Sequence, residues 1–438
     1  EVFADKGGFD VVIANPPYVR QEQIRDEKQA FSQVYGSDSK YNVYGGRTDL
    51  YVYFYARGLR LLHDHGVLCF ISSDKLMSRG YARKVRRVLA DNLALICLVD
   101  FGEEPVFDAT VEPCVLIGHR SLQSVDASHR LVYCEIESLE QISDMARTVR
   151  QTGWEVPQKR LGSDEWILVR PEAAEIVQLI RSRGIPLGRH VDGRIFCGIK
   201  TGRNKVFIID EHTRQKLISA DLRSAEIIRK WLVGSDIDKW RVNWGGKYLI
   251  FTPHGIDISR YPVVLDYLRG FKDTLLRRAT SSSHEWYELQ QPQMGIYQFF
   301  ESPKIVYQNV SRYYKFALDT HGHFPDMNVF VIPVGDLYLL GVLASSTMRF
   351  FAQALTGTKS GGFLVLKTMY VEQFPIPLCS DDEERRNIEH IVSQLVNGDS
   401  VGRDTMDLER QLDDAVYSLF NLSSEQIEII EDEIKTRA

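Results

Sequence analysis

Blocks of apolar and polar residues alternate along the first third of the chain. Short runs of Val, Ile, Leu and Cys between polar turns are typical of buried strands. Such runs occupy residues 9–14, 66–73, 94–101 and 111–119. Residues 49–62 and 75–93 instead carry apolar side chains at helical spacing. Strands that alternate with helices predict an α/β sheet, and the last two strands predict an antiparallel pair at its edge.

The pattern changes further along the chain. Residues 120–185 are mixed and polar, which predicts the last edge elements and a connector. From Ile185 onwards, frequent glycines separate short apolar runs, and this predicts an irregular β-rich module. Beyond residue 380, apolar spacing in 388–396 and 408–419 predicts helices, and Ser423 can cap one more.

The first strand ends at the corner Asn15-Pro16-Pro17-Tyr18. Ligands of open α/β sheets bind at the carboxyl ends of strands. Prolines fix φ and lack an N–H, so the carbonyls of Asn15 and Pro16 are left to face a ligand. The Asn15 side-chain oxygen and the Pro16 carbonyl can each accept one N–H of an exocyclic amino group, while Tyr18 offers a flat face to its ring. The alternative is a rigid turn without chemistry.

This corner resembles motif IV of the amino-group DNA methyltransferases, specifically the γ-type N6-adenine enzymes. The nearest group is the Eco57I/TaqI-like methylases, many of them fused to a nuclease in type IIG restriction–modification enzymes. Further stretches resemble TaqI-like target-recognition domains in the same order: Gly198–Asn204, Trp286–Leu289, Lys304–Ser311 and Phe374–Pro377. The resemblance implies the carboxyl-terminal half of a class I, Rossmann-like α/β sheet, an irregular α+β target-recognition domain and a helical tail.

Four segments follow from this resemblance. They are a partial catalytic domain at 1–135 (motifs IV–VIII), a connector at 136–184, a DNA target-recognition domain at 185–380 and an acidic helical segment at 381–438. No Gly-rich loop precedes the first strand. The resemblance therefore implies that the amino-terminal half of the catalytic domain, with most of the S-adenosylmethionine pocket, is a missing partner of this chain.

The activity implied by the resemblance is site-specific transfer of a methyl group from S-adenosylmethionine to N6 of a flipped adenine in duplex DNA. Asn15 and Pro16 would polarise N6, and Tyr18 would stack on the base. Phe107 stands where motif VIII places an aromatic residue against the opposite face of the base. The alternative for Phe107 is a core residue under a loop. Pro17 would line the adenine of the cofactor.

The net charge of −6 conceals a segregation of charge. Residues 181–380 carry 26 Lys+Arg against 17 Asp+Glu, a net of +9, whereas residues 381–438 carry 6 against 16, a net of −10. A basic middle region favours a polyanion-binding module. The candidate DNA contacts are Lys200, Arg203, Asn204, Lys205, Arg277, Arg278, Arg312 and Lys359. Solvated charges or a plain helix end would explain the same residues without DNA.

Two other functions stay open: a DNA-binding specificity fragment without activity of its own, and a protein-glutamine N-methyltransferase, whose amide nitrogen poses the same chemical problem. The six cysteines are scattered and show no CxxC spacing, so we expect reduced cysteines, no metal and a cytoplasmic protein. No apolar run reaches membrane-spanning length, and we expect neither a membrane span nor a signal peptide. The chain shows no nuclease signature, so Mg²⁺ is expected only with an upstream nuclease.

Overall fold

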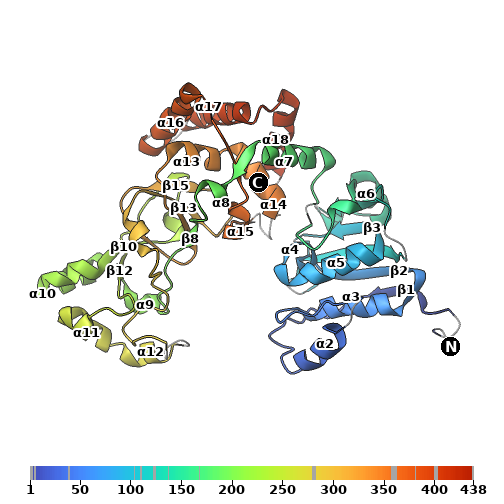
Figure 1. Cartoon of the computed structure of the whole chain (residues 1–438), viewed down its shortest axis with the longest axis horizontal. Helices are drawn as coiled ribbons and strands as arrows, with labels where there is room; N and C mark the ends of the chain where they lie inside the picture. The colour runs from blue at the N-terminus through green and yellow to red at the C-terminus, as the bar shows by residue number, and fades with distance from the viewer. Residues whose placement is uncertain are drawn as a thin grey trace. The chain divides into compact units, whose positions relative to one another are not determined.

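The computed structural model describes residue 3 and residues 6–37, 40–102, 104–108, 111–121, 125–136, 138–166, 168–278, 283–356, 363–379, 381–398 and 403–436. These residues form two compact units, one within 1–176 and one made of 177–356 and 363–438 (Figure 1). Within these ranges, no helix is long and apolar enough to cross a membrane.

A six-stranded sheet with the order β1-β2-β4-β3-β5-β6 is the centre of the first unit. Its strands are β1 (Phe9–Ala14), β2 (Leu62–Ser73), β3 (Leu93–Asp100), β4 (Pro113–Arg120), β5 (Arg130–Glu135) and β6 (Trp154–Pro157). β1 and β2 are parallel, β4 runs antiparallel to both β2 and β3, and β5 is parallel to β3. β6 closes the sheet antiparallel to β5. The carboxyl ends of β1, β2 and β3 therefore lie at one edge of the sheet, together with the start of β4.

The helices of this unit are α2 (Lys28–Tyr35), α3 (Leu50–Leu61), α4 (Lys75–Ser78), α5 (Arg83–Asn92) and α6 (Met145–Thr152). The predicted strands and the helix at 49–62 are present, with bounds shifted by a few residues. The predicted helix at 75–93 is wrong as a single helix, because the extended backbone of Arg79 and a 3₁₀ turn from Gly80 to Ala82 divide it into α4 and α5.

The predicted edge pair β3–β4 is also placed differently. β4 lies between β2 and β3, and β5 and β6 continue the sheet beyond them. β6 falls in the predicted connector 136–184, so the sheet runs past the predicted boundary at residue 135. The sequence pattern does not predict this extension of the sheet, because polar residues separate the short strands β5 and β6.

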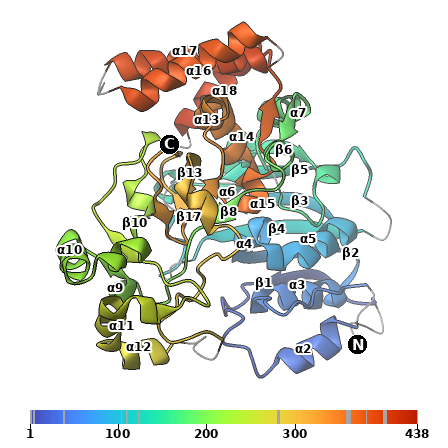
Figure 2. The same cartoon turned by 60° about the vertical axis from the view of Figure 1, so that its left-hand side comes forward.

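Side chains from the two faces of the sheet enter separate cores. The larger core contains Val52 and Leu59 of α3, Val85 and Leu89 of α5, and Leu98 of β3, all buried. The smaller core forms around Cys97 and Val99 of β3 and takes Met145 and Val149 from α6. Helices α3 and α5 thus cover one face (Figure 2), and α6 covers the part of the other face that lies over β3 and β5.

The second unit combines small sheets with helices. α7 (Pro171–Ser182) leads into it from the first unit. A five-stranded sheet has the order β11-β15-β13-β17-β8, and a four-stranded sheet has the order β16-β10-β12-β9. Their strands are β8 (Phe196–Cys197), β9 (Ile208–Ile209), β10 (Ile228–Leu232), β11 (Trp240–Arg241), β12 (Tyr248–Ile250), β13 (Lys304–Gln308), β15 (Phe316–Asp319), β16 (Phe324–Pro325) and β17 (Val329–Ile332). Two short pairs join β7 (Gly184–Pro186) to β19 (Pro375–Pro377) and β14 (Val310–Ser311) to β18 (Leu364–Val365).

The helices of the second unit surround these sheets. They are α8 (Leu187–His190), α9 (Asn204–Phe207), α10 (Glu211–Ala220), α11 (Pro262–Arg269), α12 (Lys272–Leu276), α13 (Leu337–Ala344), α14 (Ser346–Thr356), α15 (Thr368–Val371), α16 (Asp382–Asn397), α17 (Arg403–Leu419) and α18 (Ser424–Thr436). The predicted cap of the last helix is confirmed, because the Ser423 hydroxyl accepts from the Gln426 N–H at 3.3 Å. The acidic helices α16–α18 belong to the same compact unit as the β-rich module.

A buried ion pair lies in the five-stranded sheet. Lys304 of β13 donates to Asp319 of β15 at 2.5 Å, and neither side chain is exposed. His323 also contacts the Asp319 carboxylate, at 2.8 Å. Burial raises the pKa of Asp319, but the His323 hydrogen bond and the Lys304 charge outweigh it and hold this pKa well below its usual range.

All six cysteines are unpaired, as predicted. Cys97, Cys114 and Cys134 are buried, Cys69 and Cys379 are half-buried, and Cys197 is exposed.

Candidate active site and nucleic-acid interface

The Asn-Pro-Pro-Tyr corner follows β1 directly. Asn15 and Pro17 are exposed, whereas Pro16 is buried. The Val19 N–H donates to the Pro17 carbonyl at 2.9 Å, and the Leu50 N–H donates to the Val19 carbonyl at 3.1 Å. These bonds hold the corner against the start of α3. Within the part of the chain that the structure describes, neither the Asn15 side chain nor the Pro16 carbonyl has a hydrogen-bond partner. Both acceptors needed for an amino group are therefore present and unused.

The structure brings Tyr18 and Phe107 together although they lie far apart in the sequence. Their ring centroids are 5.9 Å apart, and the ring planes meet at 57°. Both side chains are half-buried, so Phe107 is not simply a core residue. The Tyr18 hydroxyl is buried and has no hydrogen-bond partner among the described residues. Burial raises the pKa of Tyr18 to about 12, so the phenol stays neutral at physiological pH. The pair thus offers two aromatic faces rather than an acid or a base.

Three carboxyl groups near this sheet edge were not singled out from the sequence. Asp74 follows β2, Asp100 ends β3 and Glu112 precedes β4. The Asp74 N–H donates to the Glu112 carbonyl at 2.9 Å. Burial, together with the charges of Glu112 and Asp100, raises the pKa of Asp74 to about 8. Burial also raises the pKa of Asp100 to about 6, although its bond from the Gly102 N–H opposes this.

This carboxyl group cluster gives the edge an unusual charge state. At neutral pH, Asp74 keeps its proton and can donate a hydrogen bond, which an ordinary aspartate cannot. The cluster also lies close to the aromatic pair. Besides burial, the charges of Asp100 and Asp74 raise the pKa of Cys114, and Cys114 in turn raises the pKa of Tyr18. The sequence feature that could have indicated this cluster is a polar residue directly after a buried strand.

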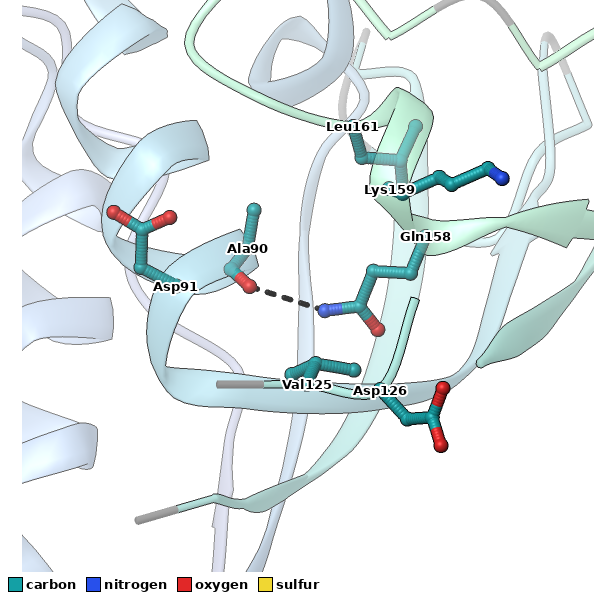
Figure 3. Close-up of a pocket in the computed structure, with 7 residues that line it drawn as sticks. All are labelled: Ala90, Asp91, Val125, Asp126, Gln158, Lys159 and Leu161. Carbon is teal, nitrogen blue, oxygen red and sulfur yellow. Dashed lines mark hydrogen bonds between the residues drawn. The ribbon is translucent and has the colours of Figure 1, made fainter. Parts of the chain in front are cut away.

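A cavity of about 400 Å³ elsewhere in the first unit lacks comparable chemistry. It is lined by Ala90, Asp91, Val125, Asp126, Gln158, Lys159 and Leu161 (Figure 3). The Gln158 amide is used internally, because it donates to the carbonyls of Ala90 and Leu93 and accepts from the Leu95 N–H. This side chain fastens α5 and β3 together, and the cavity is not the site.

The predicted DNA contacts divide into two groups. Arg203, Asn204, Lys205, Arg277 and Arg312 are exposed, and Lys200 is half-buried. None of the five basic side chains has an acidic partner among the described residues. Lys359 lies outside the described residues.

The segment that carries four of the eight predicted contacts is held by several internal hydrogen bonds. Gly202 has φ +80°, a conformation that favours glycine, and the Thr201 hydroxyl donates to the Asn204 side-chain oxygen at 2.5 Å. Lys200 pairs through its backbone with Gln291. Asn204 and Lys205 form the first turn of the short helix α9, which follows this loop.

Arg278 is the exception, and the interpretation of this residue as a DNA contact is wrong. It is buried, and its guanidinium donates to the carbonyls of Leu275, Thr201, Glu288 and Trp286 at 2.7–3.2 Å. Four of its five N–H groups are thus satisfied inside the protein. Arg278 fastens the segment 286–288 to the Thr201 loop. Its burial and these four hydrogen bonds make its guanidinium unsuited to bind a phosphate.

A sheet edge with an amine-accepting corner is joined in one chain to a β-rich unit whose basic residues lack acidic partners among the described residues. This is the arrangement expected of a DNA methyltransferase with its own specificity domain. Residues 1–107 match the Eco57I restriction-modification methylase family, and residues 229–376 match the TaqI-like C-terminal specificity domain. The chain is therefore similar to Eco57I-type restriction–modification methylases in its first unit and to TaqI-like specificity domains in its second.

Similar proteins agree with these matches. The chain is 25% identical to the Type II methyltransferase M.BstVI of Geobacillus stearothermophilus, over 98% of this chain and 76% of that protein. It is 26% identical to M.PaeR7I of Pseudomonas aeruginosa, over 96% of this chain and 72% of the relative. The Type II restriction enzyme and methyltransferase RM.Eco57I of Escherichia coli is 22% identical over 96% of this chain, which spans 47% of that protein.

One solved structure shares the fold over nearly the whole chain. It is the Type IIL restriction-modification enzyme MmeI in complex with DNA, with a TM-score of 0.63 at 14% identity. The match covers 98% of this chain and 57% of the MmeI chain.

Proposed function

We propose that this chain supplies the base-binding edge and the target-recognition domain of a site-specific DNA methyltransferase that acts on adenine N6. The observation that carries the proposal is the pairing of two unused acceptors, at Asn15 and Pro16, with the aromatic pair of Tyr18 and Phe107. An exocyclic amino group on a flat ring matches this arrangement, since two N–H bonds meet two acceptors and the ring meets two faces.

The residues of this chain would orient and polarise the amine. Acceptance of both N–H bonds by Asn15 and Pro16 favours a tetrahedral nitrogen whose lone pair points away from the ring. S-adenosylmethionine supplies an electrophilic methyl group when bound. The corner of Asn15 and Pro16 would hold N6 towards that methyl group, and solvent would take the proton that N6 gives up. The fixed geometry of the corner supports the transfer by orienting the amine beforehand.

The second unit supports DNA as the substrate. Lys200, Arg203, Lys205 and Arg277 lie in two segments that Arg278 fastens together, and none has an acidic partner among the described residues. Such residues suit phosphate contacts, which position a protein on DNA and make binding dependent on salt. A protein-glutamine methyltransferase has the same need for an amine-accepting corner, but it has no need for this basic segment.

We propose further that the sheet is the second half of a class I methyltransferase sheet, and that upstream polypeptide completes it. β1 is paired on one side only, with β2, among the described strands. Val11 is 53% exposed and Ile13 is 74% exposed, and both lie on the face that α6 covers only over β3 and β5. An unpaired edge beside exposed apolar residues suits a further strand and a covering helix. The Pro17 ring, exposed at the same corner, fits the cofactor's adenine.

The proposal is tested by methyl transfer to duplex DNA from labelled S-adenosylmethionine. This chain would be assayed alone and after co-expression with the upstream polypeptide of its parent protein. We expect label at adenine N6 in the completed protein, and a rate about 100- to 1,000-fold lower for Asn15→Ala, the cost typical of losing one transition-state hydrogen-bond partner. Asn397→Ala, an exposed residue of α16, is the matched control.

Other outcomes separate the alternatives. Label on a protein glutamine and none on DNA would favour the glutamine methyltransferase. DNA binding without label in the completed protein would favour a specificity subunit without activity.

A further inference from the structure

A cluster of two histidines and one glutamate lies in the second unit, away from the residues assigned above. His254, His284 and Glu288 each offer a ligand atom, and these atoms all lie within 4.8 Å of one another. The two imidazole rings stack with 5.3 Å between centroids and 15° between planes. The histidines are half-buried, and Glu288 is only 4% exposed. This cluster could not be predicted from the sequence, because its members are not spaced as a metal motif.

Backbone hydrogen bonds fix the tautomers of both histidines. His254 Nε2 lies 2.8 Å from the Leu289 carbonyl, and His284 Nδ1 lies 3.0 Å from the Glu285 carbonyl. A carbonyl can only accept, so each of these nitrogens carries the proton. The basic lone pairs are therefore on His254 Nδ1 and His284 Nε2. A second ring nitrogen bonded to a backbone carbonyl is the usual arrangement for histidines that bind metals.

Glu288 is oriented in the same way. Its two carboxylate oxygens accept from the Gly255 N–H at 2.6 Å and from the Glu285 N–H at 3.0 Å. Neutral N–H groups orient a carboxylate without cancelling its charge, and a buried charge is costly unless it is paired or binds a metal. The Arg278 guanidinium binds the Glu288 main-chain carbonyl and not this carboxylate.

We propose that His254, His284 and Glu288 bind one divalent transition-metal ion, with Zn²⁺ as the best match. Two imidazole nitrogens and one carboxylate oxygen form a ligand set that suits Zn²⁺, and water completes the tetrahedron. The ion would join the loop after β12 to the segment 284–289. The two are already linked by the Leu289 N–H to the Thr252 carbonyl and by the Thr252 hydroxyl to the Tyr287 carbonyl.

The position of the site suggests a structural role in recognition. The segment 284–289 supplies two of the carbonyls that hold Arg278, and Arg278 holds the Thr201 loop with its neighbours Lys200 and Arg203. An ion bound at the cluster would hold the segment 284–289 in place and thereby stabilise Arg278 and the Thr201 loop. The proposal does not depend on methyl transfer, because metal binding is measured directly.

The test is metal binding to the whole chain after chelator treatment. Calorimetric titration with ZnCl₂ should show one equivalent bound, and CoCl₂ should give the visible d–d absorption of a tetrahedral site. His284→Ala should weaken Zn²⁺ binding by more than about 100-fold, beyond the 10- to 100-fold that a change outside the ligand set causes. His212→Ala, on the exposed face of α10, should bind Zn²⁺ like the wild type. Zn²⁺, but not Mg²⁺, should raise the Tm of the wild type.

Two results would overturn the proposal. One is less than one equivalent of Zn²⁺ bound by the folded wild-type chain at saturation. The other is equal affinity in His284→Ala and His212→Ala. If His284→Ala does not fold, the cobalt spectrum of the wild type decides, since octahedral or absent bands contradict the site.

Discussion

Two substitutions at Tyr18 separate aromatic stacking from hydroxyl chemistry. Tyr18→Phe keeps the ring and removes the oxygen, whereas Tyr18→Ala removes both. We expect Tyr18→Phe to keep its activity, because the hydroxyl has no partner among the described residues and its pKa of about 12 prevents ionisation. We expect Tyr18→Ala to weaken binding of the extruded base.

The magnitudes follow from the geometry. A base stacked between two rings needs roughly 7 Å between the outer rings, at about 3.5 Å per contact. Tyr18 and Phe107 are 5.9 Å apart and tilted by 57°, so they must separate by about 1 Å and become parallel. Stacking on one aromatic residue contributes about 1–3 kcal/mol, and the lost ring–ring contact offsets about 0.5–1.5 kcal/mol of it. Tyr18→Ala should therefore cost about 0.5–1.5 kcal/mol, a roughly 2- to 13-fold loss of affinity.

Removal of the Tyr18 hydroxyl should also change the thermal stability of the protein. A buried hydroxyl without a partner costs about 1–3 kcal/mol, and since Tyr18 is half-buried we expect about 1 kcal/mol. Tyr18→Phe should thus raise the Tm of the first unit by about 2–4 °C. Differential scanning fluorimetry measures this change on the chain itself.

Base binding is measured by the fluorescence of 2-aminopurine in place of the target adenine, in the completed protein. The fluorescence should rise on binding for the wild type and Tyr18→Phe, and rise much less for Tyr18→Ala. If Tyr18→Phe loses methyl transfer as completely as Tyr18→Ala, the hydroxyl takes part in the reaction and the stacking argument is wrong.

Three further predictions concern charge. Asp74→Asn should stabilise the protein by about 2–3 kcal/mol above pH 8 and have no such effect at pH 4. The reason is that the Asp74 pKa is raised from 3.8 to about 8, so the native state loses stability as the pH rises between these values. Urea unfolding at several pH values tests this. Asp319→Asn should cost about 3–5 kcal/mol in urea unfolding, since it leaves the buried Lys304 ammonium without its counter-charge. Arg203→Gln should lower the slope of log K against log salt for DNA binding by about 1 without changing Tm, whereas Arg278→Gln should lower Tm; equal behaviour of the two arginines would contradict their assignment.

Local features could be predicted from the sequence. The Asn-Pro-Pro-Tyr corner and the strand before it lie within ten residues, and proline chemistry determines the geometry of the turn. Helix α3 and the helix cap at Ser423 also depend only on residues that lie close together in the sequence. The Tyr18–Phe107 pair is a long-range contact, and only the family resemblance indicated it.

The remaining features depend on topology and packing. Asp74, Asp100 and Glu112 come together because β4 enters between β2 and β3, and the sequence pattern alone placed it at the edge. Arg277 and Arg278 are identical neighbours, yet one is exposed and the other is buried among carbonyls. No local pattern distinguishes them, because the difference depends on where residues 201, 286 and 288 lie.

The position of β4 also affects how the chain folds during synthesis. β2 and β3 leave the ribosome before β4, yet each needs β4 as its neighbour. Until Arg120 has emerged, both strands present unpaired backbone groups and apolar side chains, which is the state most exposed to mispairing. Translation pauses or chaperones that act between residues 100 and 120 should therefore control the yield of this protein more than those acting later.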